Sequence, residues 1–141
     1  MNISLAICDD DALFLDALEK HVLKIASSVG CECTIQKLYS GAELINYCNA
    51  KPVDIIITDI DMPDIYAPNS DAQSNTDGFT AAKQLQARYP NIETVFVSAH
   101  EELAYQSFRY RPFSFISKRD LQILKPAVSA KCEGKNLFFE A

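Results

Sequence analysis

Short apolar runs alternate along the chain with longer segments in which apolar residues recur every three or four positions. Such runs are typical of buried strands, and the longer spacing is typical of helices with one buried face. The runs predict five strands, over residues 3–8, 33–38, 53–58, 92–98 and 113–117. The periodic segments predict helices over residues 11–26, from Ser40 onward, over 78–89, over 101–109 and between 120 and 132. In the first helix, the predicted buried face carries Phe14, Ala17, Leu18, Val22 and Ile25.

Five strand–helix units of this size predict an α/β fold with a doubly wound parallel sheet and helices on both faces. Residues 53–58 (VDIIIT) are the most apolar and β-branched run, so we expect them to form a central strand that is buried on both sides. In a sheet of this kind, functional sites lie at the carboxyl ends of the strands, near the point where the strand order reverses. That edge of the sheet is therefore where we expect the chemistry.

Acidic, hydroxyl and basic side chains stand at the ends of the predicted strands. Asp9 and Asp10 follow the first strand, and Asp59 follows the third. Ser98 ends the fourth strand, and Lys118 follows the fifth. Because the carboxyl ends of parallel strands share one edge, we expect three carboxylates, a hydroxyl and an ammonium group to converge there.

This set of groups suits the transfer of a phosphoryl group to a carboxylate. Mg²⁺ (or Mn²⁺) binds hard oxygen ligands and would hold Asp10 and Asp59 ionised side by side. Asp59 would attack in line as the nucleophile, and it needs no general base because an aspartate is already ionised at neutral pH. Lys118 would contact the phosphate oxygens, and Ser98 would donate a hydrogen bond to them.

Five short segments together resemble the response-regulator receiver family of two-component systems. They are ICDD at 7–10, IIITDIDMP at 55–63, Asp77-Gly78, VFVSA at 95–99 and FISK at 115–118. They occur in the family's order and cover nearly the whole chain. The resemblance implies a flavodoxin-like (CheY-like) (βα)5 fold with strand order 2-1-3-4-5, and a receiver domain over residues 1–132.

The resemblance also implies a role for each residue that matches the family's motifs. Asp59 matches the aspartate that is phosphorylated by a sensor histidine kinase, and Asp10 matches the direct metal ligand. Asp9 matches the acid that helps to hold the metal, and Asp61 matches the residue that lends its backbone carbonyl to it. Lys118 matches the family's lysine. Ser98 matches the switch hydroxyl, and Phe115 matches the switch aromatic. Asp61 and His100 match two positions that tune dephosphorylation.

A receiver of this family phosphorylates itself and loses the phosphoryl group slowly, so the resemblance implies that the chain is not an enzyme in the usual sense. Phosphorylation would change a surface of the fourth helix, fifth strand and fifth helix, which would support a homodimer or an output domain. Residues 98–118 are similar to receivers that precede LytTR-type DNA-binding domains. Residues 133–141 would then be a tail, either a linker or the first strand of an output domain. Only that output domain would bind DNA.

Two departures from the family pattern stand beside the predicted site. Gly78 follows Asp59 by 19 positions, which is longer than the family usually has, so residues 64–77 form an extra polar loop. This loop is either a tolerated surface insertion or a lid over the site. Arg119 stands where a proline commonly follows the lysine, so we expect the peptide bond after Lys118 to be trans.

Charge and cysteine content restrict the other functions. The net charge is −6 and there is no basic run, so the domain should not bind DNA by itself. Five cysteines leave one over from any complete pairing, and the amino terminus carries neither a signal peptide nor a membrane-spanning stretch. The sequence therefore predicts a reduced, cytoplasmic protein without a membrane partner.

Two further functions fit part of the pattern. The run IIITDIDMP is also similar to the start of haloacid-dehalogenase-type phosphatases, with Asp59 as nucleophile and Asp61 as general acid. Those enzymes place the motif on their first strand and need a longer chain. A receiver-like binding module that is never phosphorylated would lack the phosphoacceptor, the lysine or the acid pair, and all of these are present.

An aromatic-rich stretch surrounds the predicted fourth helix and fifth strand. Its members are Tyr105, Phe108, Tyr110, Phe113 and Phe115. We expect most of these side chains to lie in the core. Any exposed members would form a dimerisation or output-docking face.

Overall fold

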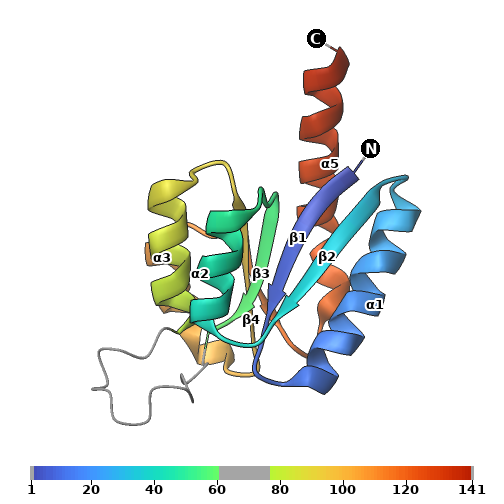
Figure 1. Cartoon of the computed structure of the whole chain (residues 1–141). Coiled ribbons are helices and arrows are strands. Elements are labelled where there is room, and N and C mark those ends of the chain that lie inside the picture. The colour runs from blue at the N-terminus through green and yellow to red at the C-terminus, as the bar shows by residue number, and fades with distance from the viewer. Residues whose placement is uncertain (1, 61–76, 141) are drawn as a thin grey trace.

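The structure is a computed structural model that describes residues 2–60 and 77–140, with side chains described up to Gly134 (Figure 1). Its strands are β1 (Asn2–Cys8), β2 (Glu32–Leu38), β3 (Ile55–Asp59), β4 (Glu93–Ser98) and β5 (Ser114–Ser117). Its longer helices are α1 (Ala12–Ser28), α2 (Gly41–Ala50), α3 (Gly78–Arg88) and α5 (Lys125–Glu140). Shorter helical turns are η2 (Glu101–Leu103), α4 (Ala104–Ser107), η3 (Phe108–Tyr110) and η4 (Leu121–Leu124).

The five strands form one parallel sheet in the order β2-β1-β3-β4-β5. Helices α1 and α5 pack on one face, where Leu18 and Val128 share a core with alternate strand residues. Helices α2 and α3 cover the other face, where Leu44 and Leu85 form a second core. The predicted doubly wound sheet and its strand order are therefore confirmed.

Strand β3 is buried along its whole length, as its apolar sequence predicts. Ile55 and Ile57 pack into the core beneath α1 and α5, whereas Ile56 packs against α2 and α3. Each fully buried aliphatic side chain of this size contributes about 1.5–3 kcal/mol. The strand that ends in Asp59 is therefore a rigid base for that residue.

Helix α1 begins at a side-chain cap and buries a face that differs from the predicted one. The carboxylate of Asp11 accepts hydrogen bonds from the backbone N–H groups of Leu13 (3.1 Å) and Phe14 (3.2 Å). The prediction that Ala17 lies on the buried face is wrong, because Ala17 is exposed and Leu15 is buried instead. Leu18, Val22 and Ile25 are buried as expected, and they pack with Leu15 in one core.

The predicted fourth helix over residues 101–109 is wrong in its extent. The structure has four residues of α-helix, Ala104–Ser107, between the two 3₁₀ turns η2 and η3. The segment ends at Arg111, which adopts the left-handed conformation with φ of 45°. A short, mixed segment of this kind has few internal hydrogen bonds and is less rigid than a long α-helix.

The expectation that the aromatic stretch lies mostly in the core is also wrong. Tyr105 is 85% exposed and Phe108 is 70% exposed, with their rings edge to face at 6.4 Å. Phe113 is exposed as well. Tyr110 stacks on Phe79 of α3 at 4.6 Å, so that side chain is held at the surface of the core.

The cysteines differ from the prediction in one pair. Cys31 and Cys132 form a disulfide with Cα atoms 6.6 Å apart, so the expectation of a fully reduced chain is wrong for these two residues. Cys8 and Cys48 are buried thiols, and Cys33 is a half-buried thiol. The pairing links the start of β2 to α5, which are 101 residues apart in the sequence.

Helix α5 continues through the segment that was expected to be a tail. Its bounds are Lys125–Glu140. The expectation that residues 133–140 contain the first strand of an output domain is therefore wrong. The domain boundary at residue 132 stays a prediction. Figure 1 shows the end of this helix projecting beyond the sheet. Among the described residues, no helix combines the length and the apolar character that crossing a membrane requires.

Glu93, at the start of β4, supplies a testable contribution to stability. One of its carboxylate oxygens is buried and has no hydrogen-bond partner among the described residues. Burial raises the pKa of Glu93 from 4.5 to about 7, and nearby Lys131 lowers it. Between these two pH values the folded chain holds a proton that the unfolded chain has lost, so stability falls as the pH rises through this window.

We therefore expect Glu93→Gln to raise the free energy of unfolding at pH 8 by about 1 kcal/mol, because the amide never ionises. At pH 4.5 the same exchange should have little effect, since native Glu93 is then protonated. Urea unfolding at both pH values measures the difference. Glu32→Gln, at an exposed position on β2, is the control, and an equal gain at both pH values would contradict this explanation.

Candidate functional site

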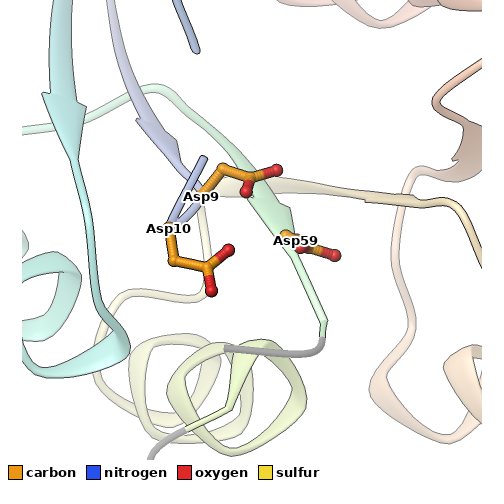
Figure 2. Close-up of side chains that lie close together, drawn as sticks. All are labelled: Asp9, Asp10 and Asp59. Atoms are coloured by element: carbon orange, nitrogen blue, oxygen red, sulfur yellow. The ribbon is translucent and has the colours of Figure 1, made fainter. Parts of the chain in front are cut away.

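Acidic residues from two neighbouring strands meet at the carboxyl edge of the sheet. Asp9 directly follows β1, and Asp59 is the last residue of β3. Strands β1 and β3 are hydrogen-bonded neighbours, with Cys8 opposite Thr58, so these two aspartates emerge side by side. Figure 2 shows both of them, with Asp10 beside Asp9 at the end of β1.

The three carboxylates are close enough to bind one cation. Asp9, Asp10 and Asp59 each offer an oxygen, and these oxygens lie within 4.8 Å of one another. Asp9 and Asp59 are buried, whereas Asp10 is exposed to solvent. Clustered carboxylates repel each other unless a cation or a proton offsets their charge.

Lys118 supplies part of that positive charge. Its ammonium nitrogen lies 2.7 Å from Asp9 Oδ2 and 3.3 Å from Asp59 Oδ2. One ammonium against three carboxylates leaves a net charge of −2 when all four groups are ionised. The described residues therefore fit a divalent cation, because hard oxygen donors, one of them exposed, are the ligands that Mg²⁺ prefers.

Burial and the contacts between Lys118 and the acids act in opposite directions on the pKa values of these groups. Burial raises the pKa of Asp9 to about 6, although its hydrogen bond with Lys118 lowers it. Burial by itself would lower the pKa of Lys118, but the Asp9 and Asp59 carboxylates raise it above its ordinary value. Lys118 is therefore charged at neutral pH and is drawn toward both acids.

Backbone groups hold the two buried acids in place. Asp9 Oδ1 accepts a hydrogen bond from the N–H of Asp11 at 2.9 Å. Asp59 Oδ1 accepts one from the N–H of Ile60 at 2.8 Å, which leaves Oδ2 facing Lys118. The Asp59 carbonyl oxygen lies so close to Gly78 that a Cβ there would meet it at 2.0 Å. Helix α3 therefore packs directly against the backbone of Asp59.

The sequence did not indicate the part that Phe14 plays. Phe14 was predicted only as a core residue of the first helix, but the Lys118 nitrogen lies 4.5 Å from the centre of its ring. A cation over an aromatic face is held by about 0.5–1 kcal/mol at such a site. The signal was not readable from spacing, since a contact between the first helix and the end of β5 depends on the fold.

The remaining predicted site residues lie around this cluster without joining it. Ser98 is fully buried, and its Oγ accepts a hydrogen bond from the N–H of His100 at 2.9 Å. His100 is exposed, with Nδ1 3.3 Å from Glu102 Oε1. Phe115 is partly buried against the core of Ile60, Phe79, Ala82 and Phe96. Asp61 and most of the 64–77 loop lie outside the described residues.

The turn after Lys118 allows the Lys118 side chain to reach the acidic cluster. The peptide bonds of the described residues are all trans, as predicted from Arg119. The N–H of Arg119 donates to Ser117 Oγ at 3.2 Å, and the N–H of Lys118 donates to the Ser98 carbonyl at 3.0 Å. The backbone on both sides of Lys118 is therefore tied to the ends of β4 and β5.

Comparison with known families identifies this arrangement. The model of the response regulator receiver domain matches residues 5–128, which is most of the chain. The chain belongs to the response regulator receiver domain family. The receiver assignment argues against a haloacid-dehalogenase-type phosphatase, because that enzyme would carry the DxD motif on its first strand and Asp59 ends the third.

Curated relatives of this receiver are longer proteins. It is 27% identical over 130 residues to the DNA-binding transcriptional regulator NtrC of Escherichia coli (strain K12), covering 87% of this chain and 24% of that protein. It is 31% identical over 97 residues to the Fimbriae Z protein of Salmonella typhimurium, covering 67% of this chain and 41% of that protein. The chain thus spans less than half the length of these relatives.

Solved structures share the fold of this receiver. The signal receiver domain of an HD domain-containing protein from Pseudomonas fluorescens Pf-5 superposes with a TM-score of 0.73 at 15% identity, covering 96% of this chain and 98% of that one. At this level of identity the likeness shows the fold alone.

Proposed function

We propose that this receiver domain accepts a phosphoryl group on Asp59 from a sensor histidine kinase, with the help of Mg²⁺ (or Mn²⁺). The observation that carries the proposal is the cluster of three carboxylate oxygens within 4.8 Å of one another, with Lys118 in contact with two of the acids. A structural salt bridge would need only one acid for the lysine. The surplus of negative charge at a strand edge suits a metal-assisted phosphoryl transfer.

The residues would divide the work as follows. Asp59 Oδ2 is the nucleophile, because Oδ1 is held by the Ile60 N–H. The bond between phosphorus and the donor nitrogen breaks as the bond from phosphorus to Asp59 forms, and the donor keeps the electron pair and takes a proton. Lys118, at 3.3 Å from Oδ2, is within reach of an oxygen on the transferred group. Asp10 and Asp59, with Asp9 and the proposed carbonyl of Asp61, would hold the metal, which offsets the charge of the incoming phosphoryl group.

Ser98 and Phe115 would carry the signal away from the site. Ser98 Oγ now accepts from the His100 N–H, and turning its hydroxyl toward the phosphoryl group exchanges one hydrogen bond for a charge-assisted one. Phe115 is only partly buried, and it would move inward behind Ser98. Phosphorylation would bias this two-state arrangement, which changes the surface formed by the η2–α4–η3 segment, β5 and α5.

The exposed aromatic side chains support a homodimer or an output contact on that surface. Tyr105, Phe108 and Phe113 are exposed on the η2–α4–η3 segment and just before β5. Clustered exposed aromatic residues are typical of interaction sites.

His100 and Asp61 are proposed to tune the lifetime of the phosphoryl group by orienting water, and the exposure of His100 supports access of solvent there.

The output of the full protein is proposed to be control of transcription in the cytoplasm. NtrC is named a DNA-binding transcriptional regulator, and the present chain corresponds to a quarter of its length. DNA would be contacted through an output domain outside these residues. The LytTR type of that domain stays a prediction from residues 98–118.

Metal binding gives a prediction of its own. Adding 10 mM MgCl₂ should raise the melting temperature by about 3–5 °C over NaCl of equal ionic strength, because a ligand of the native state adds about 1 kcal/mol when it exceeds its Kd several-fold. Asp10→Asn should abolish the rise, whereas Asp11→Asn, which keeps the helix cap, should retain it. An equal rise in Asp10→Asn would show that Mg²⁺ binds elsewhere.

Beryllofluoride, a tetrahedral mimic of a phosphoryl group, tests the proposed function directly. Fluorine NMR of the chain with Mg²⁺ and beryllofluoride should show protein-bound signals, and these should vanish in Asp59→Asn or after chelation of the metal. Binding should also shift the amide signals of Ser98 and Phe115. If the unmodified chain binds no beryllofluoride in Mg²⁺, the site is not a phosphoacceptor and the chain is a receiver-like binding module.

A further inference from the structure

We propose that Cys31 and Cys132 are a reversible, redox-sensitive thiol pair whose disulfide fixes the point at which α5 leaves the domain. The oxidant is a low-molecular-weight disulfide of the glutathione class. The two Cα atoms are 6.6 Å apart, within the range that natural disulfides span. The backbone is therefore already placed for the bond.

Both cysteines are held in place by the elements that carry them. Cys31 lies between Gly30, which has φ of 72°, and the first residue of β2. The N–H of Cys31 donates to the carbonyl of Ala26 at 2.8 Å, so the end of α1 holds its backbone. Cys31 and Cys132 are 7% and 5% exposed and lie in the core between α1, α5 and the sheet.

The pair lies at the last turn of α5 that is anchored in the core by a described side chain. Ala127, Val128 and Cys132 are the α5 residues that reach this core, and Cys132 is the last of them among the side chains that the structure describes. The helix continues to Glu140 and projects beyond the sheet (Figure 1). Near Cys132, Lys131 Nζ donates to the carbonyl of Asn91 at 2.6 Å, in an exposed hydrogen bond.

This position makes the disulfide a clamp on α5. In the oxidised state, the last anchored turn is joined covalently to the start of an edge strand. In the reduced state, the described contacts that hold the same turn are the Cys132 side chain and the exposed hydrogen bond of Lys131, so the turn opens at lower cost. Because α5 belongs to the surface proposed to change on phosphorylation, oxidation would fix the position of a moving part.

The compartment argues for a reversible bond. Disulfides in the cytoplasm are usually transient or redox-sensing, because glutathione and thioredoxin keep thiols reduced. This step rests on the proposed cytoplasmic function, whereas the pairing of the two cysteines does not. In the reaction, one cysteine thiolate attacks glutathione disulfide and releases one glutathione. The other cysteine then attacks the mixed disulfide and releases the second, so two thiols give up two electrons and two protons in total.

A redox titration of the full chain tests the pairing without any phosphorylation. The chain is equilibrated in glutathione buffers from reducing to oxidising, then denatured, alkylated and weighed. We expect all five cysteines to be alkylated at the reducing end and three at the oxidising end, with a linked Cys31–Cys132 peptide. Cys132→Ser should remain fully alkylated at every ratio. Cys33→Ser, two residues from Cys31 on β2, should still lose two alkylation sites.

Three results of this titration would overturn the proposal. They are complete alkylation at every ratio, a linked pair other than Cys31–Cys132, and a bond that stays oxidised in the most reducing buffer. The last result would mean a permanent structural disulfide. Failure of phosphorylation at Asp59, by contrast, would leave all the expected results of the titration intact.

Hydrogen exchange and melting of the wild-type chain in the two end buffers test the clamp. Amides in the last turns of α5 should exchange at least about tenfold faster in the reduced chain, while β3 amides stay protected. Closing a loop over a sequence separation of 101 residues should also raise the melting temperature by roughly 10 °C. Equal amide exchange rates of α5 in both buffers would overturn the clamp. Because both measurements use the wild-type chain, the result does not depend on whether a variant folds.

Discussion

Asp59→Asn should lower the rate at which the chain is phosphorylated by at least about a thousandfold, to the background rate. The amide has no anionic oxygen to attack phosphorus, and the other acids of the cluster cannot replace it. Asp9 Oδ1 is held by the Asp11 N–H, and Asp9 Oδ2 by Lys118 at 2.7 Å. Asp10 is exposed at the end of β1, where it would hold the metal. The rate is measured by transfer of radiolabelled phosphate from acetyl phosphate in Mg²⁺.

Asp11→Asn is the matched control for this exchange. It removes one negative charge from the same edge of the sheet, and asparagine caps a helix about as well as aspartate. Its rate should stay within about threefold of the wild type, because the exchange alters only the side chain, which caps α1 through the N–H groups of Leu13 and Phe14. The backbone N–H of residue 11, which donates to Asp9 Oδ1, is kept in the variant. Retention of label by Asp59→Asn at the wild-type rate would place the acceptor on another residue.

Gly78→Ala should lower both the stability of the chain and its phosphorylation. A Cβ at this position would lie 2.0 Å from the Asp59 carbonyl oxygen and 2.9 Å from Ile60 Cα. Both are backbone atoms of the strand end, so no flexible side chain can give way. Either α3 moves off the sheet or the backbone of Asp59 shifts. We expect a loss of roughly 3 kcal/mol and a melting temperature lower by about 10 °C.

Gly134→Ala is the control for a glycine that has space around it. Nothing lies within 4 Å of a Cβ at residue 134, which is in helix α5. Alanine there should stabilise the helix by about 0.5–1 kcal/mol. If Gly78→Ala melts and is phosphorylated like the wild type, α3 does not support the backbone of Asp59 in the way described.

The strands and the acidic cluster were predictable because short-range patterns encode them. The run that ends in Asp59 is apolar and β-branched, and it is buried along its whole length as expected. Parallel strands bring their carboxyl ends to one edge, so the meeting of Asp9, Asp10 and Asp59 followed from the topology.

Features that depend on distant residues were not predictable in this way. The aromatic spacing at Tyr105 and Phe108 imitates the buried face of a helix, but within the part of the chain that the structure describes no other element covers these side chains. The Cys31–Cys132 pair joins residues 101 positions apart, and neither residue carries a local signal of its partner. The ring of Phe14 beneath Lys118 depends in the same way on how α1 and β5 meet.

Intact-mass spectrometry after treatment with acetyl phosphate tests the central claim most directly. In Mg²⁺ the chain should gain a single phosphoryl group of about 80 Da, and fragmentation should locate it on Asp59. Chelation of the metal should prevent the gain. A chain that gains no mass with Mg²⁺ present, or one whose adduct maps to a residue outside the strand-edge cluster, would contradict the assignment of this site as the phosphoacceptor.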